Sequence, residues 1–364
     1  MLVSQNAPST IYLPLSYRPP VLLVHCLLFL ISSAGLFAQS TDRTGEVWYN
    51  FTDDGHRQFV YAVGTEDRDT VVVLHGGWGA EHSYLVSPLE PLFAERYFVF
   101  YDQRGSLRSP APDSTITIDR LVEDLDDLRQ ALGVDRLTLL AHSMGTQLAY
   151  AYLARYPERV KGLVLVGAVL PGISGSIPDS AFLAEVWPGM ERQQRADAVN
   201  DFFTSMHERA ITELREEGFV PDSLTERPAR QVINRLLQDL TDREYTRAWR
   251  IFFTAINSCN ASSWREMEGG MAFYEQSVAN AILADSLYTE RLAAAWPALQ
   301  TFGGPVRILM GTCDYVDPDA AVWRRLANRL RNGKLTIIPS AGHGAWIGNA
   351  TAFQLAVREA LDSL

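Results

Sequence analysis

Short, nearly continuous hydrophobic runs recur along the chain, and each is only four or five residues long. They are Val71–Leu74, Phe98–Tyr101, Leu137–Leu140, Leu163–Val166, Val306–Met310 and Leu335–Ile338. Runs of this kind are typical of strands that are buried on both faces of a parallel sheet. Ahead of them, Val47–Thr52 and Gln58–Val63 are predicted to form an opening pair of strands.

Helical patterns alternate with these strands. The clearest one places leucine or isoleucine on one helical face and acidic residues on the other, through Ile118, Leu121, Leu125, Leu128 and Leu132. Thr117 is expected to cap this helix and Gly133 to end it, and Thr146–Tyr156 follows the next strand as a second helix. Val322–Leu330 and Ala352–Leu361 predict two more helices. The alternation favours an α/β fold with a mostly parallel sheet of about eight strands.

A long segment between two of the predicted strands lacks any run of the buried-strand kind. It contains charged, amphipathic stretches instead: Asp179–Trp187, Arg192–Gly218, Ala229–Leu240, Asp242–Ile256 and Ala272–Leu287. We expect a helical insertion here, and insertions at the carboxyl edge of such a sheet lie over the ligand crevice. The predicted division is therefore a core formed by residues 39–167 and 305–364, interrupted by a helical cap over residues 168–304.

The N-terminal residues 1–38 have the pattern of a signal peptide. Val21–Leu30 is an apolar core, small residues follow it, and Ala38 offers a cleavage site. The prediction is an exported protein, periplasmic or extracellular, whose mature chain begins near Gln39. The alternative is an uncleaved membrane anchor, because Val21–Ala38 is 18 residues long, at the short edge of a membrane span. No later run is long and apolar enough to span a bilayer.

Composition narrows the function classes further. The 364 residues carry a formal net charge of −11, which is not the electrostatic footprint of a nucleic-acid binder. No His-Glu-x-x-His motif or comparable ligand cluster occurs, so a metallohydrolase is disfavoured and no metal is expected. Cys259 and Cys313 could form a disulfide in an oxidising compartment, but their positions in the sequence do not decide it.

The first chemical motif is Ala141-His142-Ser143-Met144-Gly145, which lies between a buried strand and a helix. A nucleophile elbow is a sharp turn between a strand and a helix, with the serine at the tip of the turn. The elbow needs small residues two positions before and after the serine, and Ala141 and Gly145 meet that need. Ser143 is therefore the predicted nucleophile.

A glycine-rich loop, His75-Gly76-Gly77-Trp78-Gly79, follows the first buried strand. Its backbone N–H groups, at Gly77 and Trp78, are predicted to supply half of an oxyanion hole. The N–H group of Met144, the residue after the nucleophile, supplies the other half. His75 is interpreted as a residue that fixes this loop rather than as a catalytic base.

An acid and a histidine follow two later strands, in the order Ser, Asp, His. Asp314 lies just after Val306–Met310, and His343 lies just after Leu335–Ile338. His343 is predicted to accept the proton of Ser143, and Asp314 to hold its imidazole in the right tautomer. Asp317 is a competing candidate for the acid, but Asp314 is favoured because it lies nearer the end of its strand.

Together these residues resemble the α/β-hydrolase superfamily and, more narrowly, its proline iminopeptidase-like branch. The most specific likeness is the pair His75-Gly76-Gly77 and Asp102-Gln103-Arg104-Gly105, in which Asp102 and Arg104 look like structural loop pins. The resemblance covers about residues 45–167 and 305–362. It implies an α/β-hydrolase fold with a helical cap, a Ser-His-Asp hydrolase activity, and no cofactor.

Two departures bear on the substrate. The branch often has a Gly-Gly-Ser-Trp-Gly elbow, whereas Ala141–Gly145 is more similar to generic esterases. The branch also tends to carry a cap glutamate that binds the free amine of the substrate, and Phe253 stands at that position. Glu275 is the candidate that would bind the substrate amine in its place. The segment between Ala168 and Pro305 has 19 acidic and 12 arginine residues, a net charge of −7, which would attract an amine.

The sequence thus predicts an exported serine hydrolase acting through an acyl-enzyme on a small-molecule or short-peptide substrate. An aminopeptidase of the proline iminopeptidase type is the preferred interpretation. A carboxylesterase or lipase for small or hydrophobic esters is the alternative. The third possibility is a non-catalytic binding protein that kept the fold. The chain argues against it, because the nucleophile, the oxyanion donors, the acid and the histidine are all present, in order and at strand ends.

Overall fold

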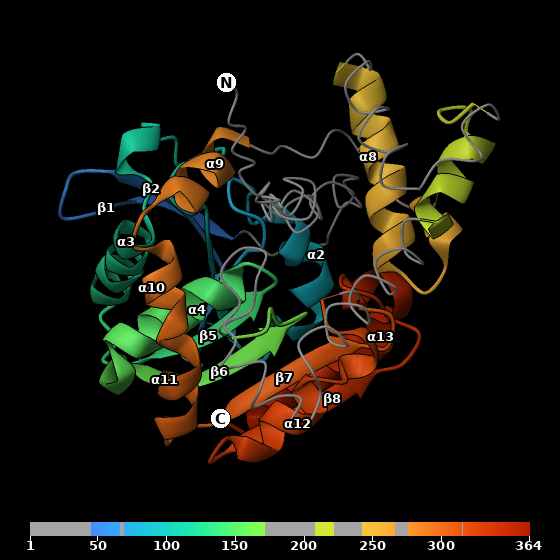
Figure 1. Ribbon diagram of the computed structural model, residues 1–364. Helices are drawn as coiled ribbons and strands as arrows, with labels where there is room; N and C mark the ends of the chain where they lie inside the picture. The colour runs from blue at the N-terminus through green and yellow to red at the C-terminus, as the bar shows by residue number, and fades with distance from the viewer. Residues whose placement is uncertain (1–44, 66–68, 172–207, 222–241, 266–275, 315) are drawn as a thin grey trace, which may run out of the picture.

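The computed structural model describes residues 45–65, 69–171, 208–221, 242–265, 276–314 and 316–364 (Figure 1). The predicted signal peptide lies outside these residues, and so does Glu275. Among the helices that the structure describes, none combines the length and the apolar character needed to cross a membrane.

Eight strands form one sheet in the order β1-β2-β4-β3-β5-β6-β7-β8. Their bounds are β1 Glu46–Phe51, β2 Arg57–Gly64, β3 Thr70–Leu74, β4 Tyr97–Tyr101, β5 Leu137–His142, β6 Val160–Val166, β7 Val306–Gly311 and β8 Gly333–Ile338. Strand β2 runs antiparallel to β1 and β4. All the other pairs are parallel. The predicted fold class, a mostly parallel eight-stranded sheet, is confirmed.

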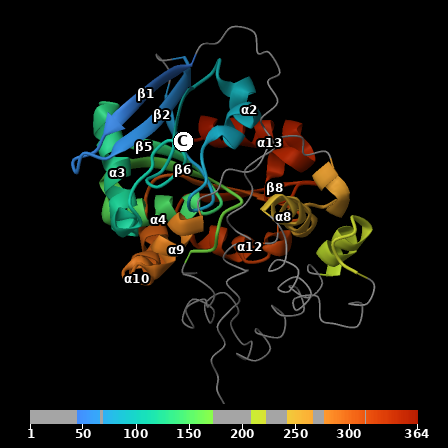
Figure 2. The ribbon, with the colours of Figure 1, turned by 90° about the horizontal axis from the view of Figure 1, so that it is seen from above.

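Helices cover both faces of the sheet (Figures 1 and 2). The labelled helices are α2 Val86–Leu89, α3 Ile118–Ala131, α4 Gly145–Arg155, α8 Asp242–Asn257, α9 Gln276–Ala284, α10 Tyr288–Ala293, α11 Ala295–Thr301, α12 Trp323–Leu326 and α13 Ala345–Asp362. Residues of α3, α4 and α12 form one buried cluster with the strand residues that point to one face of the sheet. Residues of α2 and α13 share a second cluster with the other half.

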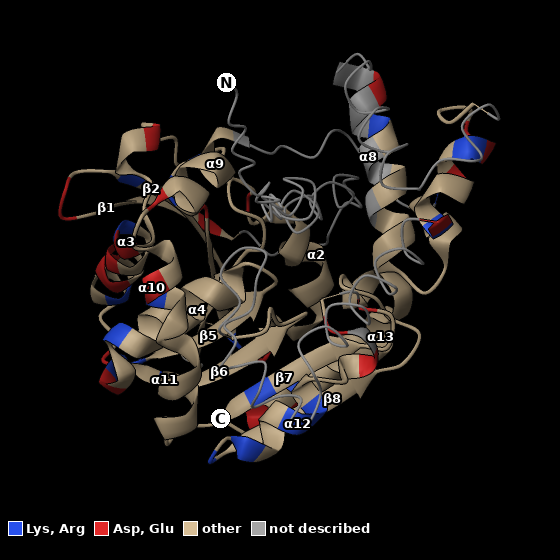
Figure 3. Cartoon of the chain, in the orientation of Figure 1, with Lys and Arg blue, Asp and Glu red and all other residues tan. Residues whose placement is uncertain are grey.

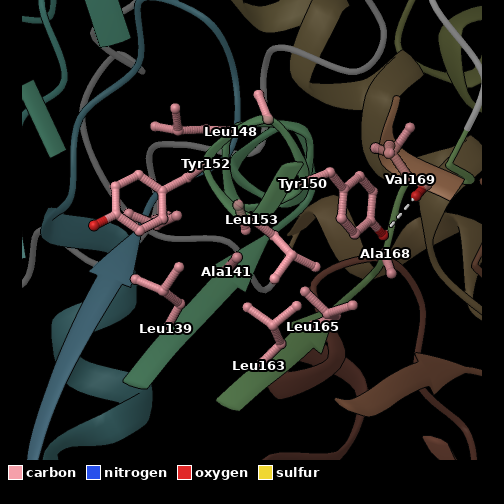
Figure 4. Packing of buried hydrophobic residues seen from close by; sticks show 14 of the residues in the cluster. Leu139, Ala141, Leu148, Tyr150, Tyr152, Leu153, Leu163, Leu165, Ala168 and Val169 are labelled. Carbon is pink, nitrogen blue, oxygen red and sulfur yellow. Dashed lines mark hydrogen bonds between the residues drawn. The ribbon is translucent and has the colours of Figure 1, made fainter. Parts of the chain in front are cut away.

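The two clusters follow from the alternation of side chains along each strand. On β5, Leu139 and Ala141 face α4, whereas Leu140 belongs to the cluster on the opposite face. Figure 4 shows Leu139 and Ala141 packed beneath Leu148 and Leu153 of α4. Both faces of β5 are therefore buried, which explains why its sequence reads as a continuous apolar run.

Helix α3 begins and ends where the sequence predicted. The Thr117 hydroxyl oxygen accepts a hydrogen bond from the backbone N–H of Arg120 at 3.2 Å, as an N-cap does. Gly133 follows the helix with a φ of +66°, a conformation that glycine adopts at little cost. Acidic residues line the outer side of α3 in Figure 3, so the apolar face points to the sheet.

Two other helices differ from their predicted bounds. The helix predicted over Val322–Leu330 is a single turn, α12, followed by a 3₁₀ turn over Ala327–Arg329. The last helix, α13, begins seven residues before the predicted Ala352, and it contains a kink at Asn349 (φ −154°, ψ 76°). The kink breaks the helical periodicity, so the part of α13 before it was not recognised.

The described part of the segment between β6 and β7 is helical and contains no strand. It consists of a helix over residues 208–216, followed by α8, α9, α10 and α11. Leu292 of α10 and Leu299 of α11 belong to the same buried cluster as Leu148 of α4. The last two helices of the segment therefore pack on the core, and the exact cap boundaries stay a prediction.

Candidate active site

Ser143 occupies a sharp turn between β5 and α4. Its φ is +53°, which is unusual for a residue with a side chain and marks a strained turn. Its backbone N–H donates to the carbonyl of Val166 at 3.0 Å, which anchors the turn to β6. Space behind the turn is minimal, because a Cβ atom on Gly145 would lie 2.5 Å from the carbonyl oxygen of Leu74. The small residue that the elbow motif requires is thus explained by packing.

His343 lies between Ser143 and Asp314. Its Nε2 atom is 2.7 Å from Ser143 Oγ, and its Nδ1 atom is 2.9 Å from Asp314 Oδ1. All three residues are buried. The three side chains come from the ends of three parallel strands, β5, β7 and β8, which meet at the carboxyl edge of the sheet. The predicted nucleophile, base and acid are therefore brought together in one chain of hydrogen bonds.

The direction of these bonds defines what the group can do. A carboxylate only accepts, so the proton of His343 lies on Nδ1 and points at Asp314. The lone pair on Nε2 then faces the Ser143 hydroxyl and can take its proton when the oxygen attacks a carbonyl. Asp314 Oδ1 also accepts from the backbone N–H of Val316 at 3.0 Å, which fixes the carboxylate in place.

Asp317, the competing acid, has a structural role. Its two carboxylate oxygens accept the backbone N–H groups of Val322, at 2.9 Å, and of Trp323, at 2.7 Å. It therefore satisfies the N-terminal donors of α12. Burial raises the pKa of this carboxyl to about 6. His343 Nδ1 bonds Asp314, the acid that the sequence analysis favours.

The glycine-rich loop that carries the predicted oxyanion donors, residues 75–79, lies directly against the elbow. A Cβ atom on Gly76 would lie 2.6 Å from Cβ of Ser143. Gly77 has a φ of +70°, which turns the following peptide. Among the residues that the structure describes, the backbone N–H groups of Trp78 and Met144 have no hydrogen-bond acceptor. These groups are therefore available to a ligand, as an oxyanion hole requires.

His75 fixes this loop to the next one. Its Nε2 atom accepts the backbone N–H of Gln103 at 3.1 Å, and the Gln103 side-chain amide donates to the His75 carbonyl at 2.9 Å. Burial lowers the pKa of His75, so the ring is held neutral as an acceptor. The structure agrees with the interpretation of His75 as a loop-fixing residue.

Asp102 and Arg104 are loop pins, as their sequence context indicated. Asp102 Oδ1 accepts from His82 Nδ1 at 2.6 Å, and Asp102 Oδ2 accepts from the backbone N–H of Arg108 at 3.1 Å. Arg104 makes two hydrogen bonds to the Asp124 carboxylate, at 2.6 and 2.8 Å. These contacts join the loop after β4 to the segment that follows the glycine-rich loop and to α3.

Glu81, His82 and Asp102 bring three potential metal-ligand atoms within 4.8 Å of one another. Their carboxylates are already engaged, because Arg108 Nη1 lies 2.9 Å from Glu81 Oε2 and 3.5 Å from Asp102 Oδ2. A guanidinium in this position supplies the positive charge that a metal would otherwise bring. The geometry is that of an ion-pair group with two buried carboxylates and a half-buried guanidinium, and it joins the segment after the glycine-rich loop to the loop after β4.

Several neighbours of the site were not recognised in the sequence. The Tyr288 hydroxyl donates to Gln147 Oε1 at 2.6 Å and accepts from Trp78 Nε1 at 3.3 Å, so it joins α10, α4 and the glycine-rich loop. Tyr84 lies 2.7 Å from His142 Nδ1 through its hydroxyl and forms a second connection beneath the elbow. Such residues are isolated aromatic or polar positions in the sequence, and only the fold brings them together.

A disulfide joins Cys259 to Cys313, with 5.1 Å between their Cα atoms. It lies beside the site, because Cys313 immediately precedes Asp314. The question that the sequence left open is thus answered by the structure. Glu275, the suggested amine anchor, lies outside the described residues, and so does the side chain of Phe253.

Comparison with known proteins places these features in a family. A family model described as the alpha/beta hydrolase fold matches residues 69–350. A proline iminopeptidase of Saccharolobus solfataricus is 35% identical over 175 residues, which cover 43% of this chain and 55% of that protein. One from Heyndrickxia coagulans is 43% identical over 96 residues, covering 26% of this chain and 33% of that protein. The matched stretches thus span between a third and just over half of these relatives.

Solved structures share the fold over a larger part of the chain. A proline iminopeptidase-related protein from Thermus thermophilus has a TM-score of 0.56 and 24% identity, covering 88% of this chain and 98% of that one. An esterase from Exiguobacterium antarcticum has a TM-score of 0.51 and 20% identity, covering 86% and 99%. At these identities the likeness is one of fold alone.

Proposed function

Because the chain belongs to the α/β-hydrolase fold family and resembles the proline iminopeptidases, we propose that it is a serine hydrolase with the triad Ser143, His343 and Asp314. One observation carries the proposal. His343 is hydrogen-bonded to Ser143 Oγ at 2.7 Å through one ring nitrogen and to Asp314 Oδ1 at 2.9 Å through the other. Nucleophile, base and orienting acid in this arrangement support acyl transfer.

The proposed reaction has two halves. Ser143 Oγ attacks the substrate carbonyl while its proton passes to His343 Nε2, and the resulting oxyanion is held by the backbone N–H groups of the glycine-rich loop and Met144. The histidine then gives that proton to the leaving amine or alcohol, which departs and leaves an acyl ester on Ser143. Water repeats the sequence, releases the acid and restores the serine.

For the substrate, we propose a free N-terminal residue, so that the enzyme is an aminopeptidase of the proline iminopeptidase type. The likeness to relatives of that name supports this choice. The acidic balance of residues 168–305 supports it as well, because it attracts a cationic amine. Phe253 and the Ala141–Gly145 elbow favour the alternative, an esterase that accepts uncharged acyl groups.

The two substrate classes are separated by blocking the amine. Hydrolysis of proline p-nitroanilide is compared with that of its N-acetyl derivative and with a short acyl p-nitrophenyl ester. An aminopeptidase should lose at least about 100-fold in kcat/KM on acetylation, because a buried acidic partner is left without its cation. Equal rates for the two amides, with faster turnover of the ester, would assign the protein to the esterases.

We also propose that the protein is exported, with residues 1–38 removed. The disulfide between Cys259 and Cys313 supports an oxidising compartment, where such bonds persist. Mass spectrometry of the protein purified from its native host decides the matter. A mature N-terminus near Gln39 is expected, whereas an intact Met1 in a membrane fraction would favour the anchor.

A further inference from the structure

Tyr84 and His142 form a buried chain of hydrogen bonds between the glycine-rich loop and the loop that carries His343. The backbone N–H of Gly76 donates to the Tyr84 hydroxyl at 2.6 Å, and that hydroxyl lies 2.7 Å from His142 Nδ1. At the other end, His142 Nε2 lies 3.2 Å from the carbonyl oxygen of His343. Tyr84 and His142 are both buried. Neither side chain has a role in the triad.

The two groups at the ends of this hydrogen-bond chain, the Gly76 N–H and the His343 carbonyl, determine where every proton lies. An amide N–H can only donate and a carbonyl can only accept. The His142 ring must therefore carry its proton on Nε2 to bond the His343 carbonyl. Its Nδ1 is then an acceptor, which takes the proton of the Tyr84 hydroxyl, and that hydroxyl accepts from Gly76. Each donor meets an acceptor, so the chain has one consistent direction.

The surroundings keep the His142 ring neutral. Burial, and then the nearby His343, lower the pKa of His142 well below its usual range. The two rings are tilted against each other, with 5.0 Å between their centroids. Trp346 packs edge-on against His142 at 4.9 Å, so water has little access to that side. A neutral His142 avoids a second cation beside His343 at the moment when His343 becomes protonated.

We propose that Tyr84 and His142 are positioning residues. They fix the position of the glycine-rich loop relative to the loop that carries His343, on either side of the nucleophile elbow. His142 directly precedes Ser143 in the sequence. The hydrogen-bond chain therefore connects the glycine-rich loop, the nucleophile elbow and the loop of His343. This inference rests on the proposed function, because it assigns a role in the same reaction. The reacting groups themselves remain Ser143, His343 and Asp314.

Removing one hydroxyl group tests the chain. Tyr84→Phe leaves the Gly76 N–H without its acceptor and His142 without its donor. We expect kcat to fall about 10- to 100-fold with KM within about twofold, since small displacements of reacting groups carry costs of this size. Tyr152→Phe is the matched control, because it removes a similarly buried tyrosine hydroxyl that bonds Asp126 at 2.9 Å, away from the site. The control should retain the kcat of the wild type.

A double variant asks whether the two residues act together. His142→Gln can place its amide N–H where Nε2 lies. Its acceptor, Oε1, is then on the terminal carbon and not at the position of Nδ1, so the Tyr84 hydroxyl loses its partner. The variant with both Tyr84→Phe and His142→Gln should therefore lose no more kcat than the more impaired of the two single variants. Losses that multiply would show two independent structural effects and would overturn the inference.

The protonation state of His142 can be read without turnover. In ¹⁵N-histidine NMR spectra, wild-type His142, assigned by its absence in His142→Gln, should show only the tautomer protonated on Nε2. Tyr84→Phe should keep that tautomer, because the His343 carbonyl still holds the Nε2 proton, but should shift the ¹⁵N resonance of Nδ1, which loses its hydrogen bond. This readout separates the inference from the proposed function, because it holds even if Ser143 proves inactive. An Nδ1-protonated ring in the wild type, or an unchanged kcat and an unchanged Nδ1 resonance in Tyr84→Phe, would contradict it.

Discussion

Cys259 and Cys313 tie the segment after α8 to the residue that precedes Asp314. The same region makes a second contact with the site, since the backbone N–H of His343 donates to the carbonyl of Asn257, the last residue of α8, at 3.0 Å. The fit is tight, because a Cβ atom on Gly342 would lie 1.7 Å from that carbonyl oxygen. The loops of the acid and of the base are thus both held by the end of one helix.

Loss of this disulfide should weaken both folding and turnover. The bond closes a loop across a sequence separation of 54 residues, which corresponds to about 4 kcal/mol of unfolding free energy in the chain-entropy account. Wild-type protein treated with reductant should show that loss in urea unfolding, together with a lower kcat. The double variant Cys259→Ser, Cys313→Ser should be equally weakened and insensitive to reductant. Equal stability of wild type and double variant would show that the bond is inconsequential.

Replacing each of the two acids separates their roles. Asp314→Asn should lower kcat by about 10⁴-fold, because the amide no longer holds the Nδ1–H tautomer of His343. Asp317→Asn should change kcat much less, since Asp317 bonds the N-terminal N–H groups of α12 and not His343. Steady-state kinetics of both variants measure this. The reverse ranking of kcat would transfer the role of the acid to Asp317.

Asp317 should also leave a signature in the pH dependence of stability. Its carboxyl loses its proton near pH 3.8 in the unfolded chain and near pH 6 in the folded protein, because burial raises its pKa. Its stabilising contribution is therefore complete below pH 3.8 and is lost as the pH rises to about 6. Over that interval, the wild type should lose up to about 3 kcal/mol of unfolding free energy relative to Asp317→Asn. Parallel stability curves for the two proteins would refute the raised pKa.

The elements of the fold were predictable where local pattern decides them. The apolar runs at Val71–Leu74 and Leu137–Leu140 became β3 and β5, and the helix after Thr117 has its expected cap. The order of strands was not predictable, because β4 lies between β2 and β3 through pairing that no local signal specifies. The early part of α13 was missed because the kink at Asn349 interrupts its period.

The candidate site was predictable from motifs at strand ends. The residues that hold its loops in place were not predictable. Ser143, Asp314 and His343 each follow a strand of a parallel sheet, so topology brings them to one edge. No motif in the sequence marks His82, yet it is buried against Asp102, which lies 20 positions away on another loop. Tyr84 and Tyr288 escaped notice for the same reason. Their partners are distant in the sequence, and a lone tyrosine carries no signal of its role.

The most direct test of the account is to trap the nucleophile. A fluorophosphonate reacts with a serine that an adjacent histidine activates, and it stays bound to the oxygen. Intact-mass and peptide-mapping spectrometry of the treated wild type should find a single adduct, on Ser143. Ser143→Ala should take up no label and lose at least about 10⁴-fold in kcat while its urea unfolding curve is unchanged. An adduct on another residue, or turnover retained in Ser143→Ala, would contradict the assignment of a serine hydrolase built on Ser143, His343 and Asp314.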